Sequence, residues 1–365
     1  MRGIRTRATA VVSLGLALML LLGGCVQAPS PQEPSSTTIG LLLPESKAAR
    51  YESTDRPSFE QTVAETCPDC QVLYANADQD AARQQQQAES MLTRGAGVLV
   101  LDAVDATGAV TIVQRAAARG VPVIAYDRFI AGAPIDYFVG VDGVRVGRLQ
   151  GEALAAALAD RRTSTRSARA GILAVHGSTT DPNAARFKAG FEAALVGTPV
   201  DVLASYDTPD WSPDKTQAWV SDQLTQFGHR VDGVYAANDA EAGGAISAMI
   251  AAGFDPVPPV TGQDAELAAI QRIVSGTQLM TVYRAIAEQS RTAAQLAVRV
   301  VRGEQPTATS QLDGIPALFL TPVAVDLTNV RRVIIDGGVY TTKEICVTPY
   351  AEACARAGLL DGASR

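Results

Sequence analysis

The chain alternates between short runs of apolar, often β-branched residues and longer stretches in which apolar residues recur at helical spacing. In the first half, the apolar runs predict strands at Ile39–Leu43, Gln71–Ala75, Gly97–Leu101, Val121–Tyr126 and Tyr137–Val141. The stretches between them, such as Asp80–Arg94 and Gly108–Arg119, predict helices that end near a glycine. Repeated strand–helix units of this kind form parallel sheets with helices on both faces.

The same alternation restarts in the second half of the chain. There the apolar runs predict strands at Gly171–Val175, Val200–Ser205, Val231–Ala236, Val260–Gly262 and Leu279–Val282. From Thr38 onward about 320 residues remain, which is long for a single core. We therefore predict two α/β domains, each a doubly wound parallel sheet, that face each other across a cleft. Ligands of open parallel sheets bind beyond the carboxyl ends of the strands.

The N-terminus has the pattern of a bacterial lipoprotein signal. Three arginines precede an apolar run from Ala10 to Leu22, and small residues then lead into Cys25. The run is too short for a comfortable membrane span, so residues 1–24 are expected to be a signal peptide. Lipidation of Cys25 would anchor the exported chain to the outer face of the cytoplasmic membrane. The alternatives are an ordinary secretory signal with an incidental cysteine, or a buried helix.

The next segment, residues 25–37, is rich in proline, serine and threonine. It cannot bury apolar surface and should be a flexible tether. The rest of the chain has the composition of a globular body, with 47% hydrophobic and 5% aromatic residues in the full sequence. The formal net charge is −7 and no basic patch is present, which argues against a nucleic acid partner.

Four cysteines remain besides Cys25, and they fall into two local pairs, Cys67 with Cys70 and Cys346 with Cys354. Outside the cytosol such pairs persist as disulfides, and we favour the two local bridges among the three connectivities that four cysteines allow. The Cys67–Cys70 spacing also occurs in redox motifs, but there it follows a strand and opens a helix. Here it follows a helical stretch, so redox chemistry is the weaker alternative.

Polar residues follow several predicted strands directly. Asp127 and Arg128 follow Val121–Tyr126, and in the second half the corresponding residues are Asn238, Asp239, Gln263, Asp264 and Arg284. Carboxylates, amides and guanidinium groups together match an uncharged polyhydroxylated ligand, and Tyr51 and Trp211 could stack on a sugar ring. Each residue alone could instead cap a helix, as Asn238 could. Glu241 is expected to face solvent, and His176 to be structural.

No arrangement of nucleophile, histidine and acid stands out, nor does a metal cluster. Gly243 and Gly244 lie in a helical pattern and lack the spacing of a phosphate-binding loop. We therefore expect no catalytic activity, no cofactor and no metal. A glycosidase would need two carboxylates that flank a bond, whereas the acids here are expected to accept bonds from sugar hydroxyls.

Five motifs resemble the bacterial D-xylose-binding proteins, which are type I periplasmic sugar receptors related to the ribose and galactose binders. They are Ala-Tyr-Asp-Arg-Phe-Ile at 125–130, Ala-Asn-Asp-Ala-Glu-Ala-Gly-Gly-Ala-Ile at 237–246, Gly-Gln-Asp-Ala at 262–265, Gly-Thr-Gln-Leu-Met-Thr-Val-Tyr-Arg at 276–284 and Leu-Thr-Pro-Val-Ala-Val-Asp at 320–326. The resemblance runs from about Ile39 to about Gly338, with the motifs in the family's order.

The resemblance implies ten sugar contacts. They are Arg50, Tyr51, Asp127, Arg128, Asp181, Asn183, Trp211, Asn238, Asp264 and Arg284. Two positions depart from the family: Pro182 replaces the middle asparagine of an Asp-Asn-Asn motif, and Arg284 replaces a lysine. An arginine keeps the charge but is bulkier and forked, which bears on the choice between pentose and hexose.

The resemblance also implies the domain organisation, with a hinge of three segments. The N-terminal domain would comprise 38–142 and 286–313, and the C-terminal domain 143–285 and 314–345, followed by a disulfide-bonded tail at 346–365. The chain would be a monomer that closes on D-xylose and docks on the permease of an ABC transporter. Glucose or another pentose is an alternative ligand, and a receptor that feeds a sensor kinase is an alternative role. A repressor of the same fold would need a helix-turn-helix in place of the signal peptide.

Overall fold

The computed structural model describes residues 37–162 and 169–360. The expected signal peptide, Cys25 and nearly all of the tether lie outside these residues. Two sheets organise the described chain. The first has the strand order β10-β11-β5-β4-β3-β1-β2, in which β10 runs antiparallel to β11 and the other neighbours run parallel. Its strands are β1 (Thr38–Leu43), β2 (Gln71–Asn76), β3 (Val98–Leu101), β4 (Val123–Tyr126), β5 (Tyr137–Val141), β10 (Ser310–Leu312) and β11 (Ile315–Leu320).

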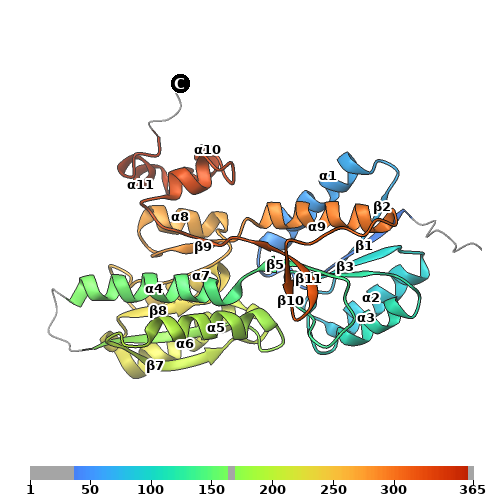
Figure 1. The fold of residues 1–365 in the computed structure, drawn as a ribbon. Helices are drawn as coiled ribbons and strands as arrows, with labels where there is room; N and C mark the ends of the chain where they lie inside the picture. Colours follow the sequence, from blue (N-terminus) through green and yellow to red (C-terminus); the bar gives the residue numbers. More distant parts are fainter. Residues whose placement is uncertain (1–36, 163–168, 361–365) are drawn as a thin grey trace, which may run out of the picture. The chain divides into compact units, whose positions relative to one another are not determined.

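Helices cover both faces of this first sheet. On one face, α1 (Arg56–Thr66) and α9 (Ile286–Val301) lie side by side (Figure 1) and pack on Ile39 and Leu41. On the other face, α2 (Ala81–Thr93) and α3 (Val110–Ala117) pack on alternate residues of the same strands. The central strands are apolar on both faces because both faces are buried, which is why they read as continuous apolar runs. We call this sheet and its helices the N-terminal half.

The second sheet has the order β7-β6-β8, with all pairs parallel. Its strands are β6 (Ala170–His176), β7 (Val200–Asp207) and β8 (Gly233–Ala236). On one face lie α4 (Gly143–Arg162) and α5 (Pro182–Leu195), and on the other α6 (Pro213–Phe227) and α7 (Asp239–Ala251). The strand expected at Val260–Gly262 is reduced to a single bridge between Val260 and Val234. This sheet and its helices, with α8 (Leu267–Ser275), are the C-terminal half.

The chain passes between the two halves three times. It leaves the first sheet between β5 and α4, returns between β9 (Thr281–Tyr283) and α9, and leaves again between β11 and β12 (Val323–Val325). β9 and β12 pair with each other as a separate antiparallel ladder. β11 pairs with β5, so residues 315–320 belong to the first sheet, although the expected boundaries assign 314–345 to the C-terminal domain. The domain boundaries stay a prediction. In the structure, the third crossing between the halves comes after Leu320.

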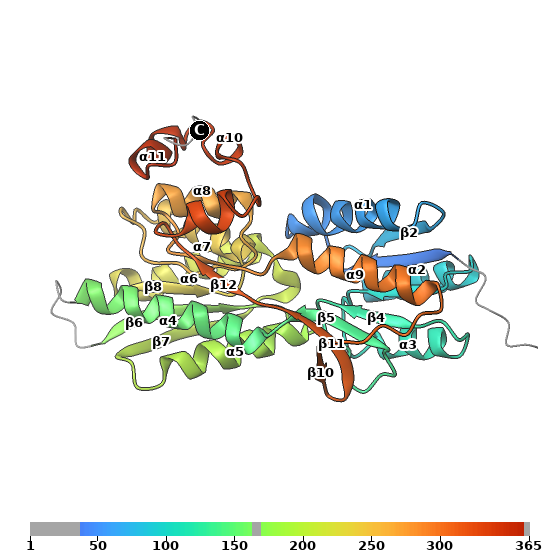
Figure 2. The same cartoon turned by 45° about the horizontal axis from the view of Figure 1, so that its top comes forward.

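The C-terminal segment adds short helical turns to this frame. These are η4 (Arg331–Ile335), α10 (Thr342–Ile345) and α11 (Ala351–Arg356), and α10 and α11 contact α8 (Figure 2). Disulfides join Cys346 to Cys354 in this segment and Cys67 to Cys70 after α1, which are the two local pairs predicted. No helix among the described residues is both long and apolar enough to cross a bilayer.

Candidate functional site

A polar cavity lies between the two halves, where the carboxyl ends of strands from both sheets meet. Its volume is about 20 Å³ in this structure. The cavity is lined by all ten predicted contact residues: Arg50, Tyr51, Asp127, Arg128, Asp181, Asn183, Trp211, Asn238, Asp264 and Arg284. None of these residues is more than 7% exposed, so polar contacts among them are little weakened by water. The structure thus brings the ten together, while their role in ligand binding stays a prediction.

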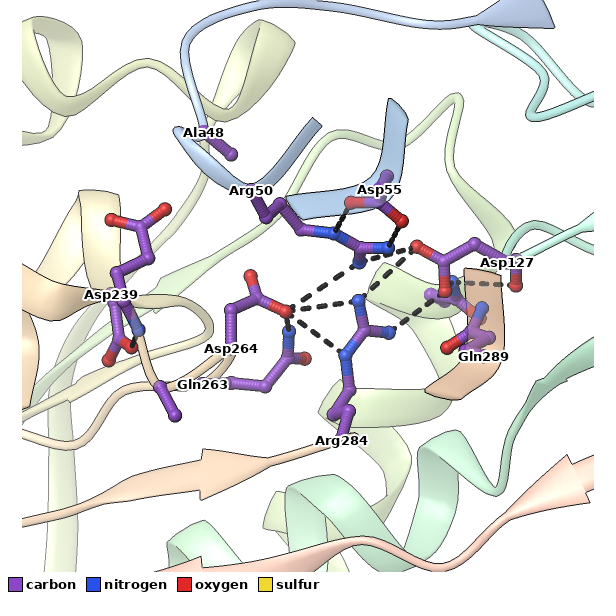
Figure 3. Close-up of polar contacts among 12 residues, drawn as sticks. Ala48, Arg50, Asp55, Asp127, Asp239, Gln263, Asp264, Arg284 and Gln289 are labelled. Carbon is purple, nitrogen blue, oxygen red and sulfur yellow. Dashed lines mark hydrogen bonds and ion pairs between the residues drawn. The ribbon is translucent and has the colours of Figure 1, made fainter. Parts of the chain in front are cut away.

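Asp127 accepts hydrogen bonds from three other residues, of which the two arginines are labelled in Figure 3. Arg50 Nη1 donates to Asp127 Oδ2 at 2.8 Å, and Arg284 Nη1 donates to Asp127 Oδ1 at 2.9 Å. Asn183 Nδ2 donates to the Asp127 carbonyl at 3.2 Å. Asp127 follows β4 with φ of 60°, a left-handed conformation that aspartate tolerates better than most side chains. Because Arg284 and Asn183 come from the other half, Asp127 joins the two halves of the chain.

Arg50 is held in place from behind by Asp55, at the end of η1 (Tyr51–Asp55). Its Nε and Nη2 donate to the two carboxylate oxygens of Asp55 at 2.8 and 2.7 Å, a bidentate pair. The Tyr126 hydroxyl donates to the same carboxylate. Burial raises the pKa of Asp55, and the neighbouring Arg50 charge opposes that shift. Arg50 therefore presents only its remaining nitrogen, Nη1, to the cavity.

Asp264 follows the bridge at Val260 and is bonded on two sides. Arg284 Nε donates to Asp264 Oδ1 at 3.0 Å, and Gln263 Nε2 donates to the same oxygen at 2.5 Å. Its φ is 102°, and its backbone N–H donates to the Val282 carbonyl at 3.0 Å, which fixes the strained turn. Burial raises the pKa of Asp264 well above its ordinary value, with Arg50 opposing the shift.

Groups from three loops surround the guanidinium group of Arg128. Its Nε lies 2.8 Å from Asp181 Oδ2, Nη1 donates to the Ala103 carbonyl at 2.9 Å, and Nη2 donates to the Tyr51 hydroxyl at 3.3 Å. Asp102 lies beneath it, with Oδ1 3.3 Å from Nε. Asp102 is fully buried, and burial raises its pKa well above the ordinary value. Arg128 therefore cannot turn away from the cavity without leaving buried acids unpaired.

Three of the contacts, Asp181, Trp211 and Asn238, lie just before the helices α5, α6 and α7. Asp181 caps α5 by accepting from the Asn183 N–H at 2.8 Å, and Asn238 caps α7 by accepting from the Glu241 N–H at 2.9 Å. Trp211 ends η2 (Pro209–Trp211) with φ of 56°, and its ring lies over Gly177. A Cβ at Gly177 would come within 1.9 Å of that ring. The helix-cap reading of Asn238 is thus correct, and the same residue also lines the cavity.

Sequence reasoning missed four lining residues: Glu45, Ala48, Phe187 and Gln263. Gln263 had the strand-end signal but was not included in the site. Glu45 lies two residues after β1; its carboxylate accepts from the Ala48 N–H at 3.1 Å, and burial raises its pKa. Asp102 does not line the cavity but supports Arg128, and it directly follows β3, so the same strand-end rule would have found it.

Two neighbouring residues test other expectations. Glu241 does not face solvent as expected: it is fully buried, and burial raises its pKa well above the ordinary value. The expectation was wrong because the first turn of α7 faces the core of the C-terminal half. His176 is buried against the stacked rings of Phe191 and Tyr235, and burial lowers its pKa to about 4. Among the described residues, no group of histidine, cysteine and acid side chains is arranged to hold a metal ion.

Two α/β halves with a polar cavity between them, formed by strand ends of both sheets, define a two-domain ligand-binding protein. Residues 39–305 match the periplasmic binding protein domain family, and the chain belongs to that family. The D-xylose-binding periplasmic protein of Escherichia coli is 32% identical over 315 residues, which cover 84% of this chain and 92% of the relative. That of Haemophilus influenzae is 31% identical over 337 residues, 90% and 98% of the two chains.

Among solved structures, an ABC transporter solute-binding protein from Clostridium phytofermentans with bound β-D-glucose is similar to this chain. The TM-score is 0.75 at 25% identity, with 84% of this chain and 99% of that chain covered. A carbohydrate transporter solute-binding protein from Chloroflexus aurantiacus, in complex with D-glucose, gives a TM-score of 0.73 at 25% identity and covers 84% and 97%. The predicted fold class and family resemblance are confirmed.

Proposed function

We propose that the chain is an exported receptor that binds a neutral monosaccharide, D-xylose first of all, in the cavity between its halves. It releases the sugar unchanged to the permease of an ABC transporter. One observation carries this proposal: ten side chains from seven separate parts of the chain, buried and polar or aromatic, converge on one cavity. Structural ion pairs alone would not require Asn183, Asn238, Tyr51 and Trp211 to line the same space.

The charge balance of the cavity favours an uncharged ligand. Its lining contains three arginines and four acidic side chains, and each arginine pairs with at least one carboxylate. A sulfate or carboxylate ligand would have to displace these acids from their arginines at high desolvation cost. Sugar hydroxyls can both donate to Asp127 or Asp264 and accept from Arg50 or Arg284, so they fit without a change of net charge.

The names of the relatives support a sugar as the ligand, and D-xylose is the sugar that we propose first. Two relatives that are more than 30% identical over most of the chain are both named for D-xylose binding, whereas the two solved structures described above hold glucose. Pro182 and Arg284 depart from the family's pattern, and both border the cavity region. A pentose is therefore the first candidate and a hexose the second.

Closure of the two halves on the sugar is the mechanism that this site supports. Bonds across the halves form at the cavity, where Arg284 and Asn183 bond Asp127. Outside it, Glu266 accepts from the Ala49 N–H at 3.2 Å, Thr180 donates to the Val104 carbonyl at 3.0 Å, and Lys47 pairs with Asp210. A ligand bonded by both halves favours the closed form by its differential affinity for that form. The closed form would then dock on the permease.

Export and anchoring complete the proposal. Residues 1–24 would be removed and Cys25 lipidated, which places the receptor on the outer face of the membrane next to its permease. Two or three acyl chains anchor far more firmly than one, because each buried CH₂ contributes about 0.8 kcal/mol.

A thermal-shift screen of the purified mature protein tests the proposal. A ligand that binds only the native state raises stability by RT ln(1 + [L]/Kd), about 2.7 kcal/mol at a hundredfold excess over Kd. We expect D-xylose to give the largest shift in a panel that includes L-arabinose, D-ribose, D-glucose and D-galactose. Asp264→Ala should abolish the shift without unfolding the protein. A panel in which no monosaccharide raises the melting temperature would overturn the proposed function.

A further inference from the structure

A second and larger cavity adjoins the candidate sugar site. Its volume is about 660 Å³, and its lining shares Arg50 and Asp264 with the sugar site. We call it the flanking groove. Its lining residues come from 49–54 in the N-terminal half, from 264–271 in the C-terminal half and from the crossing between β9 and α9. Residues 337–340 of the C-terminal segment also line it.

The groove has the chemistry of a carbohydrate subsite. Its lining combines two tyrosines with hydroxyl, amide and carboxyl groups: Tyr283, Tyr340, Ser53, Thr54, Gln271 and Glu266. Both tyrosine rings are partly exposed, so an apolar ring face remains available for stacking against sugar C–H groups. Burial raises the pKa of Tyr340 to about 12, so its hydroxyl stays protonated and can donate a hydrogen bond.

Arg50 and Asp264 line both cavities. Arg50 Nη1 lies 3.7 Å from Asp264 Oδ1, which is longer than a direct hydrogen bond. A hydroxyl group of a sugar ring can accept from Arg50 and donate to Asp264, and it would then point toward the groove. If that oxygen is glycosidic, it still accepts from Arg50 but has no hydrogen to donate to Asp264, and the next sugar ring lies in the groove.

We propose that the flanking groove is a second subsite, which accepts the next ring of a disaccharide or short oligosaccharide whose first ring occupies the sugar site. The inference rests on the proposed function, since it assigns the ligand class of the same site. It enlarges that class from monosaccharides to short xylo-oligosaccharides. The polar lining and the position of the shared residues carry it, and the groove's size exceeds what a single ring requires.

Calorimetry of the purified mature protein with D-xylose and with β-1,4-xylobiose tests the inference. We expect xylobiose to bind with a Kd within about tenfold of that of xylose, a difference of about 1.4 kcal/mol at most. Binding of xylose without measurable binding of xylobiose would overturn the inference and leave the proposed function standing. Binding of xylobiose alone would support the groove and correct the monosaccharide assignment. Binding of neither sugar would overturn both.

Variants in the groove separate the second subsite from the first. Ala268 lies exposed on α8 within the groove, so Ala268→Trp should fold normally and fill the groove. We expect this variant to raise the Kd for xylobiose about tenfold or more and to leave that for xylose unchanged, with Ala268→Ser as the matched control. Tyr340→Ala should act in the same direction, and Tyr340→Phe should keep the stacking ring. Equal effects of Ala268→Trp on both sugars would contradict the second subsite.

Discussion

Arg284 and Asp127 meet across the two halves of the chain as a forked pair, with Nη1 2.9 Å from Oδ1 and Nη2 3.2 Å from Oδ2. The two residues are 157 positions apart in sequence. Arg284 also contacts Asp264 of its own half, at 3.0 Å from Nε to Oδ1. One guanidinium group thus connects the two central carboxylates of the site, and its position depends on how the halves are placed.

Removal of the Asp127 carboxylate should be severely destabilising. Asp127→Ala leaves Arg50 and Arg284, which are 3% and 2% exposed, without this partner. Loss of one partner of a buried ion pair costs about 3–5 kcal/mol. Urea unfolding measures the loss. As a control, Glu304→Ala breaks the half-exposed pair with Arg299 and should cost less than about 1 kcal/mol. Equal losses in the two variants would show that the Asp127 network contributes no special stability.

The position of Trp211 should depend on a glycine. Gly177→Ala places a methyl group 1.9 Å from the Trp211 ring, so the ring must move out of the cavity wall. We expect the sugar affinity to fall about tenfold or more, because a displaced aromatic contact costs on the order of 1.4 kcal/mol. Gly108→Ala is the control, since its nearest neighbours would be at 3.6 Å. Calorimetry with the sugar identified in the thermal-shift screen gives the comparison, and an unchanged Kd in Gly177→Ala would exclude Trp211 as a contact.

His176 should make the protein less stable in acid. Burial lowers its pKa to about 4 in the folded protein, against about 6.5 in an unfolded chain. The folded state therefore disfavours the protonated ring, and the free energy of unfolding decreases as the pH falls from about 6.5 toward 4. The full loss from this group is about 3 kcal/mol.

The variant His176→Phe isolates this contribution, because phenylalanine keeps a ring against Phe191 and Tyr235 but cannot titrate. Urea unfolding at pH 7 and at pH 4.5 should show a smaller acid loss in this variant than in the wild type. The control is His229→Asn, since His229 is exposed. An equal acid loss in the wild type and in His176→Phe would assign the loss to other groups.

Cys25 should determine whether the exported chain is held on the membrane. Cys25→Ser removes the thiol that would receive the acyl chains, and a serine cannot be lipidated in its place. We expect the wild type in the membrane fraction of cells and the variant in the soluble or secreted fraction. Ser30→Ala is the control, since it changes the same segment of the chain and leaves Cys25 in place. If the wild type also fractionates as soluble, the lipoprotein signal is refuted and an ordinary secretory signal takes its place.

The sequence predicted most of this architecture because the strands of parallel sheets are marked by local apolar runs. It did not predict β11, whose run contains Pro316 and whose partner β5 lies about 180 residues earlier in the chain. In the site, Asp127, Asn238 and Asp264 follow from the strand-end rule. Arg50, Asp181 and Asn183 were predicted only from the family resemblance, since they lie in loops and at helix starts, where apolar residues show no regular spacing.

The burial of acidic side chains could not be read from local pattern. Glu241 looks like a favourable charge at a helix start, and only the packing of α7 against the sheet shows that it is enclosed. Asp102 is tolerated because Arg128 arrives from the neighbouring strand. Local sequence thus predicts which residues lie at the strand ends. The pairing of the strands decides which of these residues form ion pairs with each other.

Arg284 offers the sharpest test of ligand choice, since it occupies a position where the family resemblance implies a lysine. The guanidinium group bonds Asp127 and Asp264 at once, whereas an ammonium group is a single compact charge and cannot form the fork. Arg284→Lys should therefore keep the charge, loosen the bonds between the halves and leave more room in the cavity.

We expect this variant to bind D-xylose about tenfold more weakly, a loss of about 1.4 kcal/mol. Its affinity for D-glucose should fall less, because the exocyclic CH₂OH group of a hexose can use the added room. The ratio of the two Kd values, measured by calorimetry, is thus expected to shift toward glucose. A ratio equal to that of the wild type would show that Arg284 binds the sugar without selecting its size, and the selection would then lie with Trp211 or with the loop at Pro182.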